Sequence, residues 1–173
     1  MMQMLQAGGM ALLTDGARTA DPDNPRGYFE LEAVKRLPSA TGWLDDAVGR
    51  AVKVVHALVS NLPDRYAYRV IRMRRRLEAV VASQRRMLER RGETADDLPE
   101  DRLIAVFRAQ LEALEGWMAA RRNFASLEID YDALFDDPRP LAERIDRFLG
   151  GGLDVDAMVA SVDPALRRGG GAG

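Results

Sequence analysis

The sequence predicts an α/β fold, with a parallel sheet and helices on both of its faces. Short β-compatible stretches alternate along the chain with longer stretches whose apolar residues recur at helical spacing. Parallel strands require such crossover connections, because a tight turn cannot bring the chain back in the same direction. The expected strands are residues 51–57, 68–73 and 126–131, and a shorter fourth candidate covers residues 10–13.

Size and composition fit one globular domain. The chain has 173 residues, of which 47% are hydrophobic and 30% are charged, and its formal net charge is −2. We expect one domain over residues 1–168, followed by a flexible glycine-rich tail over residues 169–173.

The residue types that are missing exclude several kinds of site. The chain has no cysteine and one histidine, so disulfides and thiolate metal sites are excluded and a zinc centre is disfavoured. No apolar run approaches the roughly 20 residues that a membrane span needs. No basic-then-apolar signal opens the chain. We therefore expect a cytoplasmic protein with no metal and no membrane partner.

The N-terminal third contains two expected helices separated by a loop. Residues 1–7 read as a Met-rich helix that ends at the glycine pair after it. Residues 14–27 are rich in Asp, Pro, Asn and Gly, which is typical of a loop. Residues 29–37 have the apolar spacing of a helix and end before Pro38.

The middle of the chain supplies the predicted sheet core. Residues 51–57 are almost continuously apolar and β-branched at their centre, which favours a buried parallel strand. Residues 68–73 alternate as a strand, and residues 77–91 have helical spacing.

The C-terminal half continues the same alternation. A long helix is expected to begin at a capping box formed by Asp97 and Glu100, and its apolar stripe continues to Met118. The remaining expected elements are a strand over 126–131, a helix over 138–149 whose start is capped by the Asp136-Asp137-Pro138 sequence, and a final helix over 154–162.

The turn between strand 68–73 and helix 77–91 carries three consecutive arginines. Residues 69–91 contain nine arginines and two glutamates, although the whole chain is slightly acidic. A helix N-terminus at the carboxyl end of a strand binds anions, because its free N–H groups and its dipole favour negative charge. We expect a phosphate or a sulfate there, with Ser83 facing the same ligand. The alternative is a solvated arginine cluster.

Three segments of the chain carry a combined pattern. Arg75 is followed eight residues later by Ser83 on the expected helix. Residues 131–138 read Tyr-Asp-Ala-Leu-Phe-Asp-Asp-Pro, and the helix after them ends in Phe-Leu-Gly at residues 148–150. Residues 24–30 read Asn-Pro-Arg-Gly-Tyr-Phe-Glu. Together these segments resemble the sulfotransferase family, in particular its bacterial members.

This resemblance implies a P-loop NTPase-like sulfotransferase fold. It also implies 3′-phosphoadenosine 5′-phosphosulfate (PAPS) as the sulfuryl donor, with Arg75 and Ser83 holding its 3′-phosphate. The acceptor would be a hydroxyl or an amine on a small molecule, a carbohydrate or a peptide. No nucleic-acid partner is expected, because aromatic residues do not interleave with the arginines and the net charge is negative.

Two residues are candidate catalytic bases. His56 is the only histidine, near the end of the expected strand 51–57, and the family often has a His placed similarly. An imidazole suits proton transfer near neutral pH. Glu30 is the rival, from the loop side. The structural alternatives are a core or rim histidine and a carboxylate that complements a helix dipole.

The family's Ser-, Gly- and Thr-rich 5′-phosphosulfate loop has no counterpart here. In the family, the helix that resembles residues 1–7 would follow directly after that loop. We therefore expect an N-terminally truncated form in which Met1 is an internal methionine of a longer protein, and an intact mass of about 19 kDa for the native protein would contradict this. An incomplete sheet would expose strand edges and favour association of copies as a homo-oligomer.

Three other functions stay open at this level. A non-catalytic nucleotide-binding or interaction module could keep the fold and lack the chemistry. A nucleic-acid binder would use the arginine-rich helix. A P-loop kinase relative would differ in the loop that this chain lacks.

Overall fold

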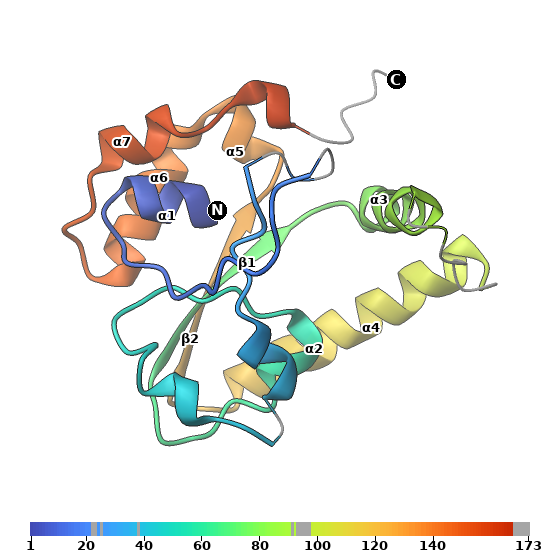
Figure 1. Cartoon of the computed structure of the whole chain (residues 1–173), viewed down its shortest axis with the longest axis horizontal. Helices are drawn as coiled ribbons and strands as arrows, with labels where there is room; N and C mark the ends of the chain where they lie inside the picture. Colours follow the sequence, from blue (N-terminus) through green and yellow to red (C-terminus); the bar gives the residue numbers. More distant parts are fainter. Residues whose placement is uncertain (22–23, 25, 38, 91, 93–97, 168–173) are drawn as a thin grey trace.

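The computed structural model shows a mixed α/β protein with a small parallel sheet at its centre (Figure 1). Strands β1 (Tyr68–Arg74) and β2 (Phe124–Asp130) pair in parallel, with Tyr68 opposite Phe124 and Arg74 opposite Asp130. The structure describes residues 1–21, 24, 26–37, 39–90, 92 and 98–167.

Seven α-helices and three 3₁₀ helices are defined within these described residues. The α-helices are α1 (Met2–Ala7), α2 (His56–Val59), α3 (Leu77–Arg90), α4 (Glu100–Ala119), α5 (Ala133–Asp136), α6 (Pro138–Leu149) and α7 (Val155–Ala160). The 3₁₀ helices are η1 (Glu32–Arg36), η2 (Gly42–Leu44) and η3 (Pro164–Leu166).

One face of the sheet is covered by α1, α6 and α7 (Figure 1). Ile71, Leu127 and Ile129 point to this face, as the alternation of side chains along a strand requires. The core on this side is fully or nearly fully buried and comprises Met4, Leu5, Ile129, Leu134, Leu141, Ala142, Ile145 and Met158. The apolar face of the N-terminal helix thus has its partner in α7.

The opposite face is covered by α4 together with α2, η1 and η2. Tyr68, Val70 and Phe124, the residues that alternate with the first set, pack here. The buried residues on this side are Val34, Leu37, Leu44, Val59, Leu62, Leu114 and Met118. The predicted α/β class with helices on both faces of a parallel sheet is therefore confirmed at this coarse level.

The predicted strand over 51–57 is wrong. Ala51 forms an isolated parallel bridge with Leu12, and residues 52–55 are not part of any strand. A one-turn helix, α2, then begins at His56. Val52 and Val54 pack against the core on the α4 side. A continuous apolar run indicates that a segment is buried, but it does not show whether that segment is a strand.

Smaller differences concern the ends of the elements. The fourth strand candidate at 10–13 is reduced to the bridge at Leu12. The helix expected over 29–37 is the 3₁₀ helix η1. β2 begins two residues earlier than expected, at Phe124, and ends before Tyr131. Asp97 of the expected capping box and the tail at 169–173 lie outside the described residues.

The strongest sequence signals are confirmed. Helices α1, α3 and α6 occupy the expected ranges within one residue where the structure describes them. Gly150 ends α6 with φ +109°, a left-handed conformation that favours glycine. Within the described ranges, no helix combines the length and apolar character needed to cross a membrane.

Candidate functional site

A hollow of about 280 Å³ lies where β1 ends and α3 begins. Two further elements contribute to it, namely α4 and the turn between β2 and α5. Its lining residues are Arg74, Arg75, Arg76, Leu77, Glu78, Arg108, Asp130 and Asp132. Four arginines and three acidic residues therefore face this space, and its charge balance is positive although the chain as a whole is acidic.

The local sequence places the arginines at this junction. The alternating strand ends at Arg74, and α3 begins at Leu77, so Arg75 and Arg76 form the connection. The amide of Val80 donates to the carbonyl of Arg76 at 3.2 Å, which starts the helical hydrogen-bond pattern. The first N–H groups of a helix lack partners within the helix, and they point toward the space before it.

Arg74 is largely neutralised by neighbouring strand β2. Its Nε lies 3.0 Å from Glu128 Oε1, and its Nη2 lies 2.7 Å from Asp130 Oδ2. The other oxygen of Asp130 accepts hydrogen bonds from the amides of Ala133 and Asp132, at 3.0 and 2.9 Å. The Ala133 amide above all, then Asp132 and Arg74, hold the pKa of Asp130 below its ordinary value. Asp130 is thus an anion whose charge is already compensated.

Asp132 also has a cationic partner. Arg167, at the C-terminal end of the described chain, places Nε 3.4 Å from Asp132 Oδ1 and Nη1 2.6 Å from Asp136 Oδ1. Two of the three carboxylates at the hollow are therefore paired by Arg74 and Arg167, which weakens their repulsion of an incoming anion.

The structure brings Arg75 to the hollow and does not bring Ser83 there. The Arg75 guanidinium carbon lies 4.7 Å from the centre of the Tyr131 ring, which supports its side chain. Ser83 is half-buried on α3 and is not among the lining residues. It stands six residues beyond the start of the helix, about 9 Å along the axis at 1.5 Å per residue.

Arg108 is the arginine of the hollow that sequence reasoning missed, and the acidic residues Glu78, Asp130 and Asp132 were not predicted as part of the site either. Arg108 lies on the exposed side of α4, far from the arginine turn in the sequence. The helical periodicity predicts that position 108 is polar and near the edge of the apolar stripe. Periodicity does not tell which polar residue of a 20-residue helix faces the start of another helix.

His56 is not among the residues that line the hollow. It opens α2, and its Nε2 lies 2.9 Å from Oε1 of Gln110 on α4. Its ring also meets Phe107 edge-on, with centroids 5.9 Å apart. The expectation that His56 stands at the carboxyl end of a strand is wrong, because no strand forms over residues 51–57. α4 holds the imidazole instead.

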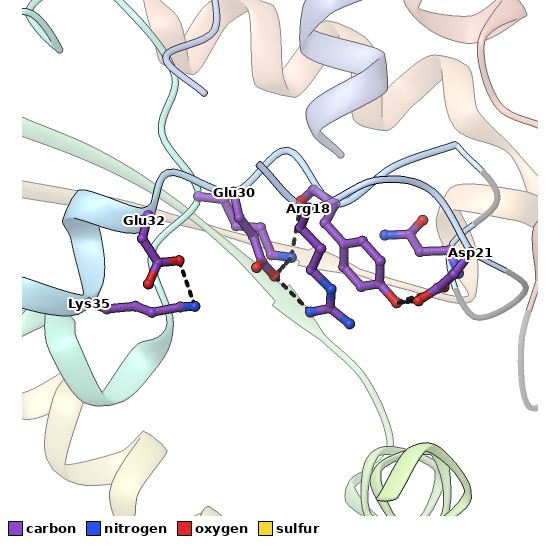
Figure 2. A network of polar contacts seen from close by, with 8 residues as sticks. Arg18, Asp21, Glu30, Glu32 and Lys35 are labelled. Atoms are coloured by element: carbon purple, nitrogen blue, oxygen red, sulfur yellow. Dashed lines mark hydrogen bonds and ion pairs between the residues drawn. The ribbon is translucent and has the colours of Figure 1, made fainter. Parts of the chain in front are cut away.

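Glu30 belongs to a network of charged and aromatic side chains, shown in Figure 2. Its Oε1 lies 3.4 Å from Nη1 of Arg18 and 3.1 Å from Nζ of Lys53. Lys53 Nζ also donates to the carbonyl of Tyr28 at 3.2 Å, and the Arg18 guanidinium stacks 3.2 Å from the centre of the Tyr28 ring. Both cations therefore pair with the same oxygen of the Glu30 carboxylate.

The backbone beside Glu30 is strained. Phe29 has φ +52°, a left-handed conformation that is uncommon for a residue other than glycine. This bend separates Tyr28, which contacts Arg18, from Glu30, which pairs with Arg18 and Lys53. The residues on both sides of Phe29 thus belong to one network of contacts.

A second, smaller hollow of about 90 Å³ adjoins Glu30. It is mainly apolar, with two lysines and the Glu30 carboxylate around it, and its lining residues are Glu30, Leu31, Val34, Lys35, Lys53, Val55 and Leu58. Neither hollow has His56 among its lining residues.

No group of three or more His, Asp or Glu side chains within the described ranges is arranged to hold a metal ion. Comparison with known proteins adds no assignment: no protein-family model matches this chain, and no curated protein and no solved structure matches it significantly. Any function must therefore be argued from the residues of the chain itself.

Proposed function

We propose that the hollow at the β1–α3 junction binds a nucleotide phosphate, and that the chain is a sulfotransferase-family protein that uses PAPS. It would transfer the sulfuryl group to a hydroxyl or an amine acceptor. The observation that carries the proposal is the position of Arg75, which lines a positively balanced hollow directly before α3 and at the end of a parallel strand. The P-loop NTPase-like form of the fold is part of the same proposal.

The physical argument for a phosphate rests on two kinds of donor. A guanidinium can donate two parallel hydrogen bonds to phosphate oxygens, and the N-terminus of α3 adds backbone N–H groups and a favourable dipole. Hydrogen bonds to charged groups contribute about 1.5–3 kcal/mol each.

Ser83 and the candidate bases have different support. Ser83 is not among the residues that line the hollow, so the proposal for the 3′-phosphate rests on Arg75 and not on the Ser83 hydroxyl. His56 is the better base candidate, since one imidazole nitrogen is engaged with Gln110 and the other is a separate site for a proton. Glu30 pairs with Arg18 and Lys53, so these ion pairs would have to break before its carboxylate could serve as the base.

The transfer step would proceed in line. The acceptor oxygen or nitrogen attacks sulfur as the base takes its proton, and a new bond to sulfur forms. The bond between sulfur and the bridging oxygen of the 5′-phosphosulfate breaks, and the electron pair leaves on adenosine 3′,5′-bisphosphate.

A second candidate function is a non-catalytic nucleotide-binding module. One observation favours it: neither His56 nor Glu30 is among the residues that line the arginine-rich hollow. Both candidate bases are also held by contacts with other side chains. Such a module would bind the nucleotide and transfer nothing.

Isothermal titration calorimetry with adenosine 3′,5′-bisphosphate and adenosine 5′-monophosphate tests the binding proposal. We expect the bisphosphate to bind at least tenfold more tightly, and Arg75→Ala to abolish this preference. Arg86→Ala is the matched control, because Arg86 is an exposed arginine of α3 that does not line the hollow. Equal affinity for both nucleotides, or no binding of either, contradicts the proposal.

An assay of sulfuryl transfer distinguishes a sulfotransferase from a non-catalytic nucleotide-binding module. The protein would be incubated with ³⁵S-labelled PAPS and a mixture of hydroxyl and amine acceptors. We expect labelled product, and a loss of product with His56→Ala at unchanged bisphosphate affinity. Tight binding without labelled product would instead support the non-catalytic module.

A further inference from the structure

We propose that Arg108 of α4 is a ligand-binding residue that contacts the phosphate bound in the hollow at the β1–α3 junction. This inference rests on the proposed function of the hollow. Arg108 adds a contact from α4, which is distant in sequence from the β1–α3 junction. The proposed ligand is a dianionic phosphate bound by guanidinium groups from both places.

The packing of α3 on α4 fixes Arg108 beside the hollow. Helices α3 and α4 contact each other, and Figure 1 shows α3 beside the first half of α4. Arg85 of α3 ties the helices together: its Nη2 donates to the carbonyl of Leu98 at 2.9 Å, and its Nη1 lies 3.5 Å from Glu100 Oε2. Arg108 follows two turns after Glu100 on α4.

The acidic residues of α4 do not neutralise Arg108. Glu100 pairs with Arg85, and Glu115 pairs with Arg72 of β1. Glu112 stands one helical turn after Arg108, a spacing that commonly gives an ion pair. Among the residues that the structure describes, Arg108 nevertheless has no hydrogen bond and no ion pair, with Glu112 or with any other side chain. Its charge is therefore available to a ligand in the hollow.

The arginines of the junction and of α4 favour a phosphate or a sulfate as the ligand. Arg75 and Arg76 contribute guanidinium groups from the β1–α3 side, and Arg108 contributes one from α4. A planar guanidinium matches two oxygens of a phosphate or sulfate, and an ammonium does not reproduce this geometry. A dianionic phosphate monoester presents enough oxygens to engage the arginines of both places at once.

The experiment compares Arg108→Ala and Arg108→Lys with Arg102→Ala, using adenosine 3′,5′-bisphosphate and calorimetry at several salt concentrations. Arg102 is the matched control, because it is an exposed arginine of the same helix that does not line the hollow. We expect Arg108→Ala to weaken binding about tenfold or more, Arg108→Lys to weaken it less, and Arg102→Ala to change it by less than about twofold. The slope of log affinity against log salt should fall by about 1 in Arg108→Ala.

The outcomes separate this inference from the proposed function. If Arg75→Ala weakens binding and Arg108→Ala behaves as Arg102→Ala does, the hollow binds the phosphate and the role of Arg108 is overturned. If the wild-type protein binds no bisphosphate, or if Arg75→Ala has no effect, the proposed function fails and this inference fails with it. Circular dichroism melting curves of all variants would show that each is folded.

Discussion

His56 and Gln110 are joined by a hydrogen bond of 2.9 Å between Nε2 of the imidazole and Oε1 of the amide. An amide oxygen only accepts hydrogen bonds, so with this oxygen as its partner the neutral imidazole carries its proton on Nε2 and keeps a lone pair on Nδ1. α4 thereby fixes which nitrogen of the only histidine could act as a base. If His56 takes a proton from an acceptor, it does so at Nδ1.

We predict that neutral His56 is protonated at Nε2 in the folded protein. Long-range ¹H–¹⁵N correlation spectra on the ¹⁵N-labelled protein check this without ambiguity, because the chain has one histidine. Gln110→Leu removes the acceptor and should shift the ring toward a mixture of tautomers, whereas Gln84→Leu on the exposed side of α3 should not. A spectrum unchanged by Gln110→Leu would show that the amide does not set the tautomer.

Tyr68 makes stability depend on pH in the alkaline range. Burial above all, helped by neighbouring Tyr66, raises the pKa of Tyr68 to about 12, and its hydroxyl donates to the carbonyl of Pro63 at 2.8 Å. The unfolded chain loses this proton near pH 10, and the folded protein keeps it to higher pH. Stability should therefore fall as pH rises from about 10 toward 12.

Urea unfolding from pH 8 to pH 11.5 measures this effect against Tyr68→Phe, which cannot titrate. The wild-type free energy of unfolding should decline more steeply above pH 10 than that of the variant. Parallel curves for the two proteins would mean that the Tyr68 hydroxyl titrates alike in the folded and unfolded states.

Asp130 stabilises the turn that enters α5 at the edge of the hollow. Asp130→Ala removes the acceptor for the amides of Ala133 and Asp132 and should cost about 1 kcal/mol, as the loss of a helix cap does. Asp130→Asn keeps an acceptor oxygen and should cost less. Because the pKa of Asp130 is lowered, its contribution is present above about pH 4 and is lost as pH falls further.

Thermal melting between pH 2.5 and pH 7 tests the role of Asp130. The difference between wild-type and Asp130→Ala melting temperatures should shrink at the acidic end of this range. A constant difference at every pH would indicate that the charge of the carboxylate does not contribute.

Gly8 allows α1 to approach α7 closely. A Cβ atom at this position would lie 2.6 Å from Cγ of Met158 and 3.4 Å from Cβ of Leu153. Met158 is fully buried, so Gly8→Ala should destabilise the protein by about 1–3 kcal/mol through overpacking. Gly42→Ala is the control, since an added Cβ there meets nothing within 4 Å.

A double-mutant cycle with Met158→Ala shows whether the two residues act on each other. Chemical unfolding should reveal a smaller cost of Gly8→Ala when Met158 has been truncated. Strictly additive costs would place the source of the destabilisation elsewhere.

The strand–turn–helix unit around the arginines could be predicted from sequence, because its signals are local. Alternation ends at Arg74 and helical spacing starts at Leu77, so the junction is visible in the order of residues alone. The cationic hollow at that junction follows from the general geometry of strands that lead into helices.

The residues that sequence reasoning misplaced depend on tertiary packing. The apolar run at 51–57 forms no strand, α2 begins at His56, and Val52 and Val54 pack against the core beside α4. Arg108 lines the hollow because α3 packs against α4, and the contacts of Arg85 with Leu98 and Glu100 help to hold this packing. No periodicity encodes which residues such packing brings together.

The central claim is most directly tested by a crystal structure of the protein soaked with adenosine 3′,5′-bisphosphate. We predict that the 3′-phosphate lies in the hollow at the β1–α3 junction, within hydrogen-bonding distance of the Arg75 guanidinium. A nucleotide bound elsewhere, or a phosphate in the hollow that does not contact Arg75, would contradict the account.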